Sequence, residues 1–91
     1  MAQANTQQRP PHGSVELVRR VLAGGSPEGA TFEACRAVVR SEPGSEAAFH
    51  AMAMLLEGAL ADPRLDIDST RIVVWLLKEL ARGRLRVEEL V

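Results

Sequence analysis

The sequence lacks most of the aromatic residues that a surface for stacking or ligand binding needs. It contains no tyrosine, and its two phenylalanines and one tryptophan make up only 3% of the 91 residues. Hydrophobic residues nevertheless account for 46% of the chain, which is enough for one apolar core. Interiors rich in aliphatic residues and alanine pack well between helices but give poor platforms for bases or sugars. We therefore expect a small globular domain without an aromatic binding surface.

The chain also lacks an excess of charge of either sign. Eleven basic residues oppose twelve acidic ones, for a net charge of −1 at pH 7. A domain that coats nucleic acid usually carries a basic excess, because phosphate neutralisation supplies most of its affinity. The balance argues against nucleic acid as the partner. All cations except Lys78 are arginines, a bias typical of a GC-rich bacterial or phage genome.

Three further absences bear on location. The only cysteine, Cys35, cannot form an internal disulfide, which indicates a reducing compartment. Residues 1–13 are polar, contain two prolines and lack the apolar stretch of a secretory signal. No run approaches the roughly 20 apolar residues of a membrane span. We therefore expect a cytoplasmic protein without membrane contact.

Glycine, proline and serine breaks divide the rest of the chain into four predicted helices. Residues 1–13 are expected to be a disordered tail, and residues 14–91 a single domain. The expected helices cover residues 14–23, 31–40, 47–61 and 68–82, and a final helical turn covers 88–91. Ser14 and Ser45 are the predicted N-caps of the first and third helices, Gly24-Gly25 ends the first, and the fourth begins at Asp68 or Ser69. Short connections between such helices indicate an all-α fold, a compact bundle of four short helices.

Each predicted helix has an apolar stripe that should face the core. Gly58 interrupts the most apolar helix, where it marks either a close approach to a neighbour or an early fraying of the helix. The expected core residues are Val15, Val18 and Leu22; Cys35, Val38 and Val39; Phe49, Met52, Leu56 and Leu60; and Val73, Leu76, Leu77 and Leu80.

The most informative pattern is that the helices over 47–61 and 68–82 are apolar most of the way round. A surface helix needs one stripe a little over about 100° wide, and these two exceed it. One interpretation is that both helices pack centrally and the remaining chain covers them. The other is an exposed apolar patch used for self-association or for a partner protein. The predicted contact residues are Met52, Met54, Leu55, Val74 and Trp75, with Trp75 as the leading one.

The C-terminal region adds a local basic strip of Arg82, Arg84 and Arg86. This strip either meets an acidic surface of the partner or is a solvated tail. We include it among the predicted partner-binding residues.

Residues that could carry chemistry are few. Glu46 and His50 are spaced i, i+4, but two ligands do not make a metal site, so we expect a solvated pair. Cys35 is expected to be a buried, inert thiol. An acidic cluster lacks the glycine and the late glutamate of a calcium loop and is interpreted as a turn residue and helix caps: Asp62, Asp66 and Asp68. We expect no enzyme activity, metal, cofactor or small-molecule substrate.

Two segments resemble known families. Asp68-Ser69 followed by an apolar helix resembles the phosphopantetheine attachment site of acyl carrier proteins, which implies modification of Ser69; Asp66 stands where that family normally has glycine. Residues 80–90 are similar to the entry of winged helix-turn-helix domains and, with Ile72 upstream, to the C-terminal helical region of flagellar anti-sigma factors. Both of the latter resemblances imply a regulatory protein.

Together these observations predict a small non-enzymatic helical interaction protein of the regulator, inhibitor or chaperone type. It should bind a protein partner or a second copy of itself through the apolar faces of the helices over 47–61 and 68–82. One alternative is a dimeric nucleic-acid-associated transcriptional regulator that uses the C-terminal arginines. Another is an atypical acyl-carrier-like protein modified on Ser69.

Overall fold

A computed structural model describes residues 10–91, and this part of the chain is all-α, without strands. It confirms the predicted bundle of four short helices. The elements are α2 (Ser14–Ala23), α3 (Ala30–Ser41), α4 (Glu46–Leu60), α5 (Ile67–Ala81) and a 3₁₀ turn, η1 (Val87–Glu89). Of the predicted disordered tail over 1–13, residues 1–9 lie outside the described residues. Residues 10–13 form a turn in which the Ser14 hydroxyl donates a hydrogen bond to the Pro11 carbonyl at 2.7 Å.

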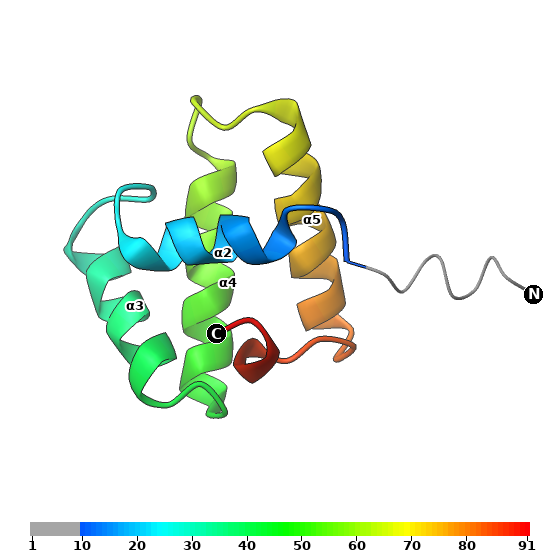
Figure 1. Cartoon of the computed structure of the whole chain (residues 1–91). Helices are drawn as coiled ribbons and strands as arrows, with labels where there is room; N and C mark the ends of the chain where they lie inside the picture. Colours follow the sequence, from blue (N-terminus) through cyan, green and yellow to red (C-terminus); the bar gives the residue numbers. More distant parts are fainter. Residues whose placement is uncertain (1–9) are drawn as a thin grey trace, which may run out of the picture.

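Two layers of unequal size make up the fold (Figure 1). Helices α3 and α5 flank α4 in one layer, and α2 crosses both α4 and α5 in front of it. The turn η1 lies below α2 on the same side and also contacts α4. We call this the covered side. We call the opposite side of the α4–α5 pair, which carries Phe49, Ala53, Leu77 and Ala81, the open side; no element of residues 10–91 crosses it.

The helix starts follow from local hydrogen bonds. The Ser45 hydroxyl accepts the Ala48 N–H at 3.0 Å, which confirms the predicted cap of α4. Helix α5 begins at Ile67, earlier than predicted, because the Asp66 carboxylate reaches the Ser69 N–H at 2.7 Å and caps the helix itself. The prediction that Ser14 caps α2 is wrong. The cap position is Gly13, whose φ of 89° suits glycine, and Ser14 is the first helical residue.

The core draws on every helix, but α2 is rotated from the predicted orientation. Leu17, Val18 and Val21 are buried, whereas Val15 is 48% exposed and Leu22 is only partly buried. Val18 belongs to both stripes, so the hydrophobic pattern alone did not determine the rotation. On the other helices the residues predicted as core but found only partly buried or exposed are Val38, Phe49, Leu60 and Leu77.

A buried arginine holds α2 in that orientation, and no pattern in the sequence indicated its burial. Arg36 on α3 is 1% exposed. Its Nε donates to the Val21 carbonyl and its Nη2 to the Pro27 carbonyl, both at 2.6 Å, while Nη1 pairs with Glu33 at 2.7 Å. Arg40 donates to the Leu22 carbonyl one turn further along α3. Two α3 arginines therefore occupy the carbonyl end of α2, where the helix dipole favours cations, and hold α2 across the bundle.

Gly58 marks a close approach of α3 and its preceding loop to α4. A Cβ on Gly58 would lie 2.8 Å from ring atoms of Phe32 and 2.8 Å from Cγ of Pro27. Real Cβ atoms are not found so near other carbons, because repulsion rises steeply below van der Waals contact. Of the two interpretations of Gly58, the structure supports the close approach.

Candidate interaction surface

An apolar groove runs along the open side between α4 and α5. Its volume is about 320 Å³. We call it the α4–α5 groove; it is lined by Phe49, Ala53, Glu57, Leu77, Lys78, Leu80 and Ala81. Five of these residues are apolar, and the two charged ones have exposed side chains. The wall of the groove is thus hydrophobic, with one acid contributed by α4 and one base by α5.

Apolar side chains continue from the groove onto neighbouring positions. Leu60, one turn beyond Glu57 on α4, is 37% exposed, and Met54 is 43% exposed. Val74, one turn before Leu77 and Lys78 on α5, is partly exposed. Because residues three or four apart lie on one helix face, Leu60 and Val74 extend the groove toward the α4–α5 connection.

The structure separates the residues predicted to bind a partner. Met52 and Leu55 are fully buried, at 0% exposure, so they belong to the core of a single chain and offer no surface. Positions two apart on a helix point roughly 160° from each other, which is why Met54 is exposed while Met52 is enclosed. Both methionines could not serve one interface.

Trp75 and Val74 lie on different flanks of α5. Trp75 is partly buried and packs against the core. It points roughly 160° away from Leu77 around the helix, and Ile72, one turn before it, lies against Gly13 at the start of α2. Trp75 therefore belongs to the covered side, whereas Val74 borders the α4–α5 groove.

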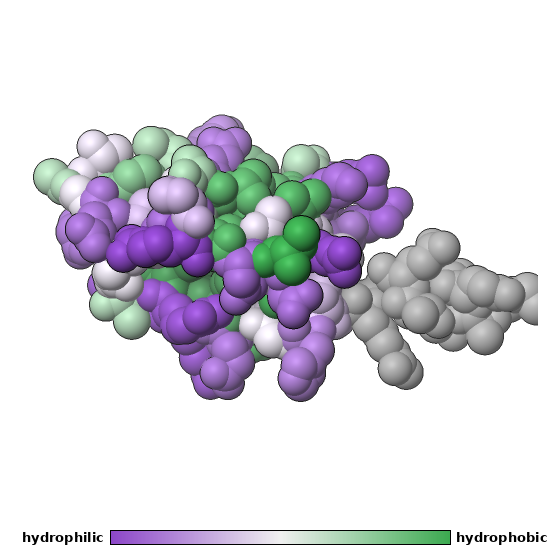
Figure 2. Space-filling model, turned by 90° about the horizontal axis from the view of Figure 1, so that it is seen from above, coloured by the Kyte–Doolittle hydropathy of each residue, from purple (hydrophilic) through white to green (hydrophobic). Residues whose placement is uncertain are grey.

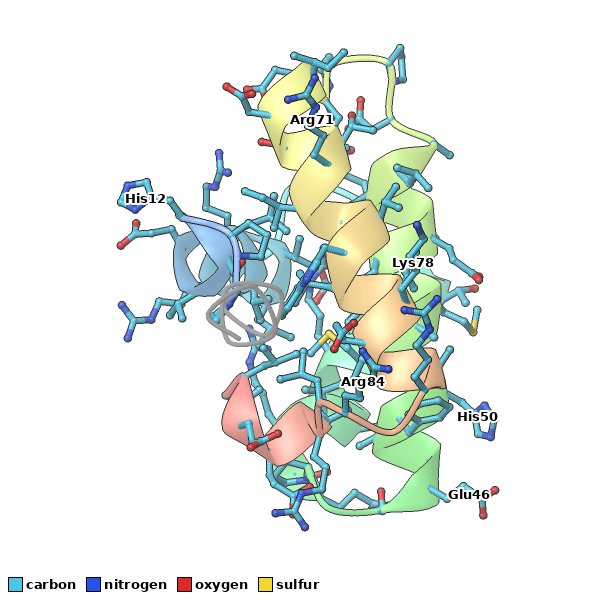
Figure 3. All side chains as sticks on the ribbon, turned by 90° about the vertical axis from the view of Figure 1, so that its right-hand side faces the viewer. His12, Glu46, His50, Arg71, Lys78 and Arg84 are labelled. Atoms are coloured by element: carbon cyan, nitrogen blue, oxygen red, sulfur yellow. The ribbon has the colours of Figure 1, made fainter. Side chains whose placement is uncertain are left out.

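Charges of opposite sign flank the groove. Glu46 and Glu57 are exposed on α4, where His50 pairs with Glu46 at 3.8 Å between Nε2 and Oε2. This confirms a solvated pair, since the two side chains are 68% and 89% exposed. On α5 the cation that lines the groove is Lys78, whereas Arg71 and Arg82 are exposed nearer to Trp75 around the helix. Figure 3 shows Glu46 and His50 projecting from one end of α4 and Lys78 from the middle of α5 on the same side.

The predicted basic strip is exposed in full: Arg82, Arg84 and Arg86. Arg82 caps the end of α5, and the Arg84 N–H donates to the Glu79 carbonyl at 3.0 Å across the turn at Gly83. The Arg86 N–H donates to the Glu89 carboxylate at 2.8 Å, so an acid follows the strip directly. The strip is a local feature of the chain end, and of its three residues Arg86 lines a hollow together with Glu46, Phe49 and Leu80.

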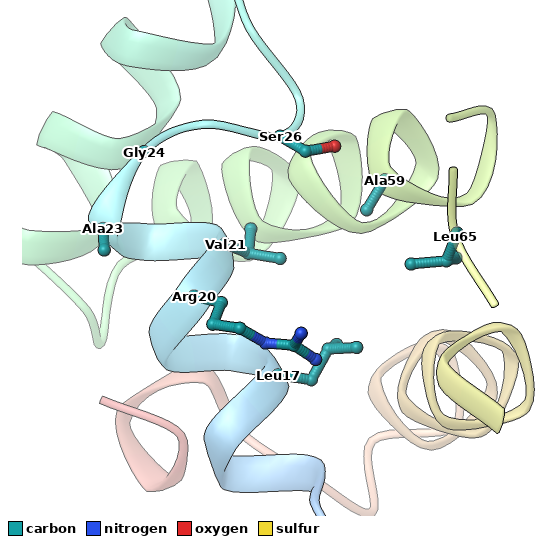
Figure 4. Close-up of a pocket in the computed structure, with 8 residues that line it drawn as sticks. All are labelled: Leu17, Arg20, Val21, Ala23, Gly24, Ser26, Ala59 and Leu65. Atoms are coloured by element: carbon teal, nitrogen blue, oxygen red, sulfur yellow. The ribbon is translucent and has the colours of Figure 1, made fainter. Parts of the chain in front are cut away.

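A second cavity, of about 400 Å³, lies on the other side, between α2 and the far half of α4. Figure 4 shows Leu17, Val21, Ala59 and Leu65 around it, with the Arg20 side chain extending past Leu17. In Figure 2, which looks onto this end of the molecule, apolar side chains gather in the middle of the face and polar ones surround them. The polar side chains of its lining are Arg20 and Ser26 alone, so the cavity offers apolar contact and little else.

Asp62 forms the turn and Asp66 the cap, as predicted, whereas Asp68 is a helical residue in the first turn of α5. Asp62 accepts from the Arg64 side chain at 2.9 Å and from the Ser26 hydroxyl, and these bonds hold the pKa of Asp62 well below its usual range. The Ser69 N–H lowers the pKa of the capping carboxylate Asp66 in the same way. Within residues 10–91 no three His, Cys, Asp or Glu side chains gather as a metal site would require.

The remaining reactive side chains are enclosed. Cys35 is a free, buried thiol at 8% exposure. Ser69 is buried in the first turn of α5, also at 8%, so its hydroxyl does not project from the surface as an acyl-carrier attachment site requires.

Comparisons of the chain with protein-family models, with curated proteins and with solved structures found no match. Each helix within residues 10–91 is too short or too polar to cross a membrane.

Proposed function

We propose that this chain is a small non-enzymatic interaction protein that binds a protein partner or a second copy of itself through its open side. The observation that carries the proposal is the α4–α5 groove, an apolar hollow between two helices that the rest of the described chain leaves uncovered. Exposed apolar surface of this kind, bordered by charges, is typical of protein–protein contact.

The proposed contact residues differ from those that the sequence suggested. From the predicted set we keep Met54 and Val74, because they lie beside the open side. Met52, Leu55 and Trp75 are assigned to the core and its edge. The new members are Phe49, Ala53, Leu77, Lys78 and Ala81.

The mechanism would be steric. Contact removes the groove's apolar area from water at roughly 25 cal/mol per Å², and the flanking charges set orientation and association rate. The proposal includes a cytoplasmic location, which is supported by the single, unpaired Cys35. Nucleic acid is not included, because acids follow the exposed C-terminal arginines and the chain's net charge is −1.

A photo-crosslinking amino acid tests the proposal. Ala81 is exposed and lines the groove, whereas Ala37 is exposed on α3 and serves as the matched control. Expressed in cells, the Ala81 probe should give a discrete crosslinked species that the Ala37 probe does not give. A Leu77→Glu substitution in the same chain should abolish it, with circular dichroism showing that the fold is retained. Identical crosslinking from both positions, or none from Ala81, would refute the proposal.

A further inference from the structure

The cavity between α2 and the far half of α4 lies apart from the α4–α5 groove, and the proposed function does not use it. Its apolar walls are Leu17 and Val21 from α2, Ala59 from α4 and Leu65 from the α4–α5 connection (Figure 4). The first three are each at most 5% exposed. The volume of about 400 Å³ falls within the range of about 300–1,000 Å³ that is usual for small-molecule sites. The cavity therefore has the size and the walls of a site for a small, largely apolar ligand.

One of the two polar side chains of the lining, Ser26, is already engaged. Its hydroxyl donates a hydrogen bond to the Asp62 carboxylate, and a serine hydroxyl has only one proton to donate. Polar groups that lose water on binding must be hydrogen-bonded, or their burial is costly. The side chains of the lining lack the several donors and acceptors that a sugar or a nucleobase would need, so ligands of these classes are disfavoured.

The other polar side chain, Arg20, supplies a cation. None of the three ion pairs within residues 10–91 involves Arg20. Its side chain extends past Leu17 toward the space that the apolar residues surround (Figure 4). The planar guanidinium presents its N–H donors as a fork, which matches the two oxygens of a carboxylate in two parallel hydrogen bonds. The cavity thus combines apolar walls with a single site for an anionic group.

The charges around the cavity favour an anion with one negative charge. The last carbonyls of α2 would repel an anion, but Arg36 and Arg40 donate hydrogen bonds to them. Asp66 lies on the other side: the N–H at the start of α5 that it accepts lowers the pKa of Asp66, and the charge of Arg20 adds to this effect. With this carboxylate nearby, one guanidinium compensates a monoanion better than a doubly charged phosphate.

We propose that this cavity binds a small amphipathic monocarboxylate, whose apolar body lies against the four walls and whose carboxylate pairs with the Arg20 guanidinium. At about 30 Å³ for each non-hydrogen atom, the volume that a water molecule occupies in the liquid, the cavity of about 400 Å³ holds about a dozen such atoms. A medium-chain fatty acid has this size and this chemistry. The site is separate from the α4–α5 groove, so the inference goes beyond the proposed function and does not depend on it.

Two probe ligands with the same alkyl chain test the inference: octanoate, and octanol, which carries a hydroxyl in place of the carboxylate. In a titration followed by ¹H–¹⁵N NMR, octanoate should shift the amide signals of Leu17, Val21, Ala59 and Leu65 most. Octanoate should bind about tenfold more tightly than octanol, because charge-assisted hydrogen bonds are stronger than neutral ones.

Two neighbouring arginines of α2 give a matched pair of variants. Arg20→Gln should raise the dissociation constant of octanoate by about tenfold, since it removes the charge, and it should leave that of octanol unchanged. Arg19 is also exposed on α2 but does not line the cavity, so Arg19→Gln should change neither constant. A general attraction of anions to this basic part of α2 would instead be weakened equally by both variants, and that result would overturn the inference.

Obstruction of the cavity tests where the alkyl chain lies. Ala59→Leu places a larger side chain on the wall and should weaken the binding of both ligands, with circular dichroism as the check of folding. Ala23→Phe does the same at an exposed position on the rim, where it leaves the core intact if Ala59→Leu does not fold. Leu77→Glu, in the α4–α5 groove, should leave the binding of octanoate unchanged.

Three further outcomes would overturn the inference. One is the absence of octanoate binding up to millimolar concentration. Another is octanoate binding that survives both obstructing variants. The third is a set of shifted signals centred on Leu77 and Ala81, which would place the alkyl chain in the α4–α5 groove. Because crosslinking from Ala81 tests the groove and octanoate tests the cavity, failure of either proposal leaves the other standing.

Discussion

Both sides of the α4–α5 pair carry apolar side chains, but only one side is covered by other elements of the described chain. On the covered side, α2 and η1 lie over the pair, and Trp75, Ile72 and Leu76 pack into or against the core. On the open side, Leu77, Val74 and Ala53 belong to the same two helices and remain partly exposed. The comparison shows that a helix with apolar residues on all faces can bury one face in the core and expose another to solvent. The placement of α2 decides which face is buried.

The largest effect should come from removing the group that holds α2 in place. Arg36→Ala leaves the Val21 and Pro27 carbonyls without their buried donor and empties the space of the side chain. We expect the free energy of unfolding to fall by about 2–5 kcal/mol, because each buried carbonyl left without a donor costs about 1–3 kcal/mol. Urea denaturation followed by circular dichroism measures it.

Glu33→Gln is the control for that experiment, because Glu33 bonds the same guanidinium but is 63% exposed. It should cost well under about 1 kcal/mol. Equal losses for the two variants would mean that the carbonyl contacts do not hold α2, and the contrast between the two sides would need another cause.

A paired substitution on α5 separates the two sides directly. Trp75→Ala should lower the free energy of unfolding by about 2–4 kcal/mol, near or below the usual range for tryptophan because the side chain is only partly buried. It should leave association of the folded protein through the α4–α5 groove unchanged. Ala81→Glu, at an exposed groove position, should instead weaken association and leave the free energy of unfolding unchanged. Sedimentation and thermal melts of both variants give the comparison, and weaker association in folded Trp75→Ala would place the tryptophan in the interface after all.

A smaller effect is expected where α3 meets α4. Gly58→Ala gains about 1 kcal/mol of helix propensity, but the new Cβ overlaps Phe32 and Pro27, and overpacking typically costs about 1–3 kcal/mol. We expect a net loss of about 1 kcal/mol in a chemical denaturation experiment. Gly44→Ala is the matched control, since its Cβ would meet only Glu88 at an ordinary 3.6 Å; it should not destabilise. A stabilised Gly58→Ala variant would show that the α3–α4 contact can accommodate an added methyl group.

The smallest effect is a pH dependence at the turn between α4 and α5. The pKa values of Asp62 and Asp66 are lowered in the folded protein, by the Arg64 and Ser69 hydrogen bonds respectively. A carboxylate with a depressed folded pKa stabilises the fold above its unfolded pKa of about 4 and loses that contribution as the pH falls below it. The melting temperature should therefore drop between about pH 4 and pH 2, and less steeply in an Asp62→Asn, Asp66→Asn double variant. Parallel acid limbs for the two proteins would contradict this.

The sequence predicted the helices better than it predicted their rotation. Ser45 and the Gly24-Gly25 pair are strong local signals, and both operate as expected. At the start of α5 the pattern predicted Asp68 or Ser69 as the beginning of the helix, whereas the Asp66 carboxylate accepts the Ser69 N–H and the helix begins at Ile67. Helix rotation is a tertiary property: Val15 and Leu17 are equally apolar, and hydrogen bonds made by Arg36, far along the chain, decide which is buried.

The candidate surface was predicted as an excess of apolar area, but its residues were not. Hydrophobicity alone does not distinguish Met52 from Met54 or Trp75 from Leu77, because each pair differs by two positions and so by side of the helix. The signal that could have found the groove is the position of the charged residues, since Glu57 on α4 and Lys78 on α5 mark the solvent-facing edges of the two helices. Charged residues mark the solvent face of a helix more reliably than apolar residues mark its buried face.

The contact at Gly58 has a consequence for the evolution of this fold. Phe32, Pro27 and residue 58 compete for the same space, so their sizes cannot drift independently. In sequences that share this fold, a larger residue at position 58 should be accompanied by a smaller one at position 32 or by loss of the proline. Such covariation would link the α2–α3 connection to the middle of α4 across more than twenty intervening positions of the alignment.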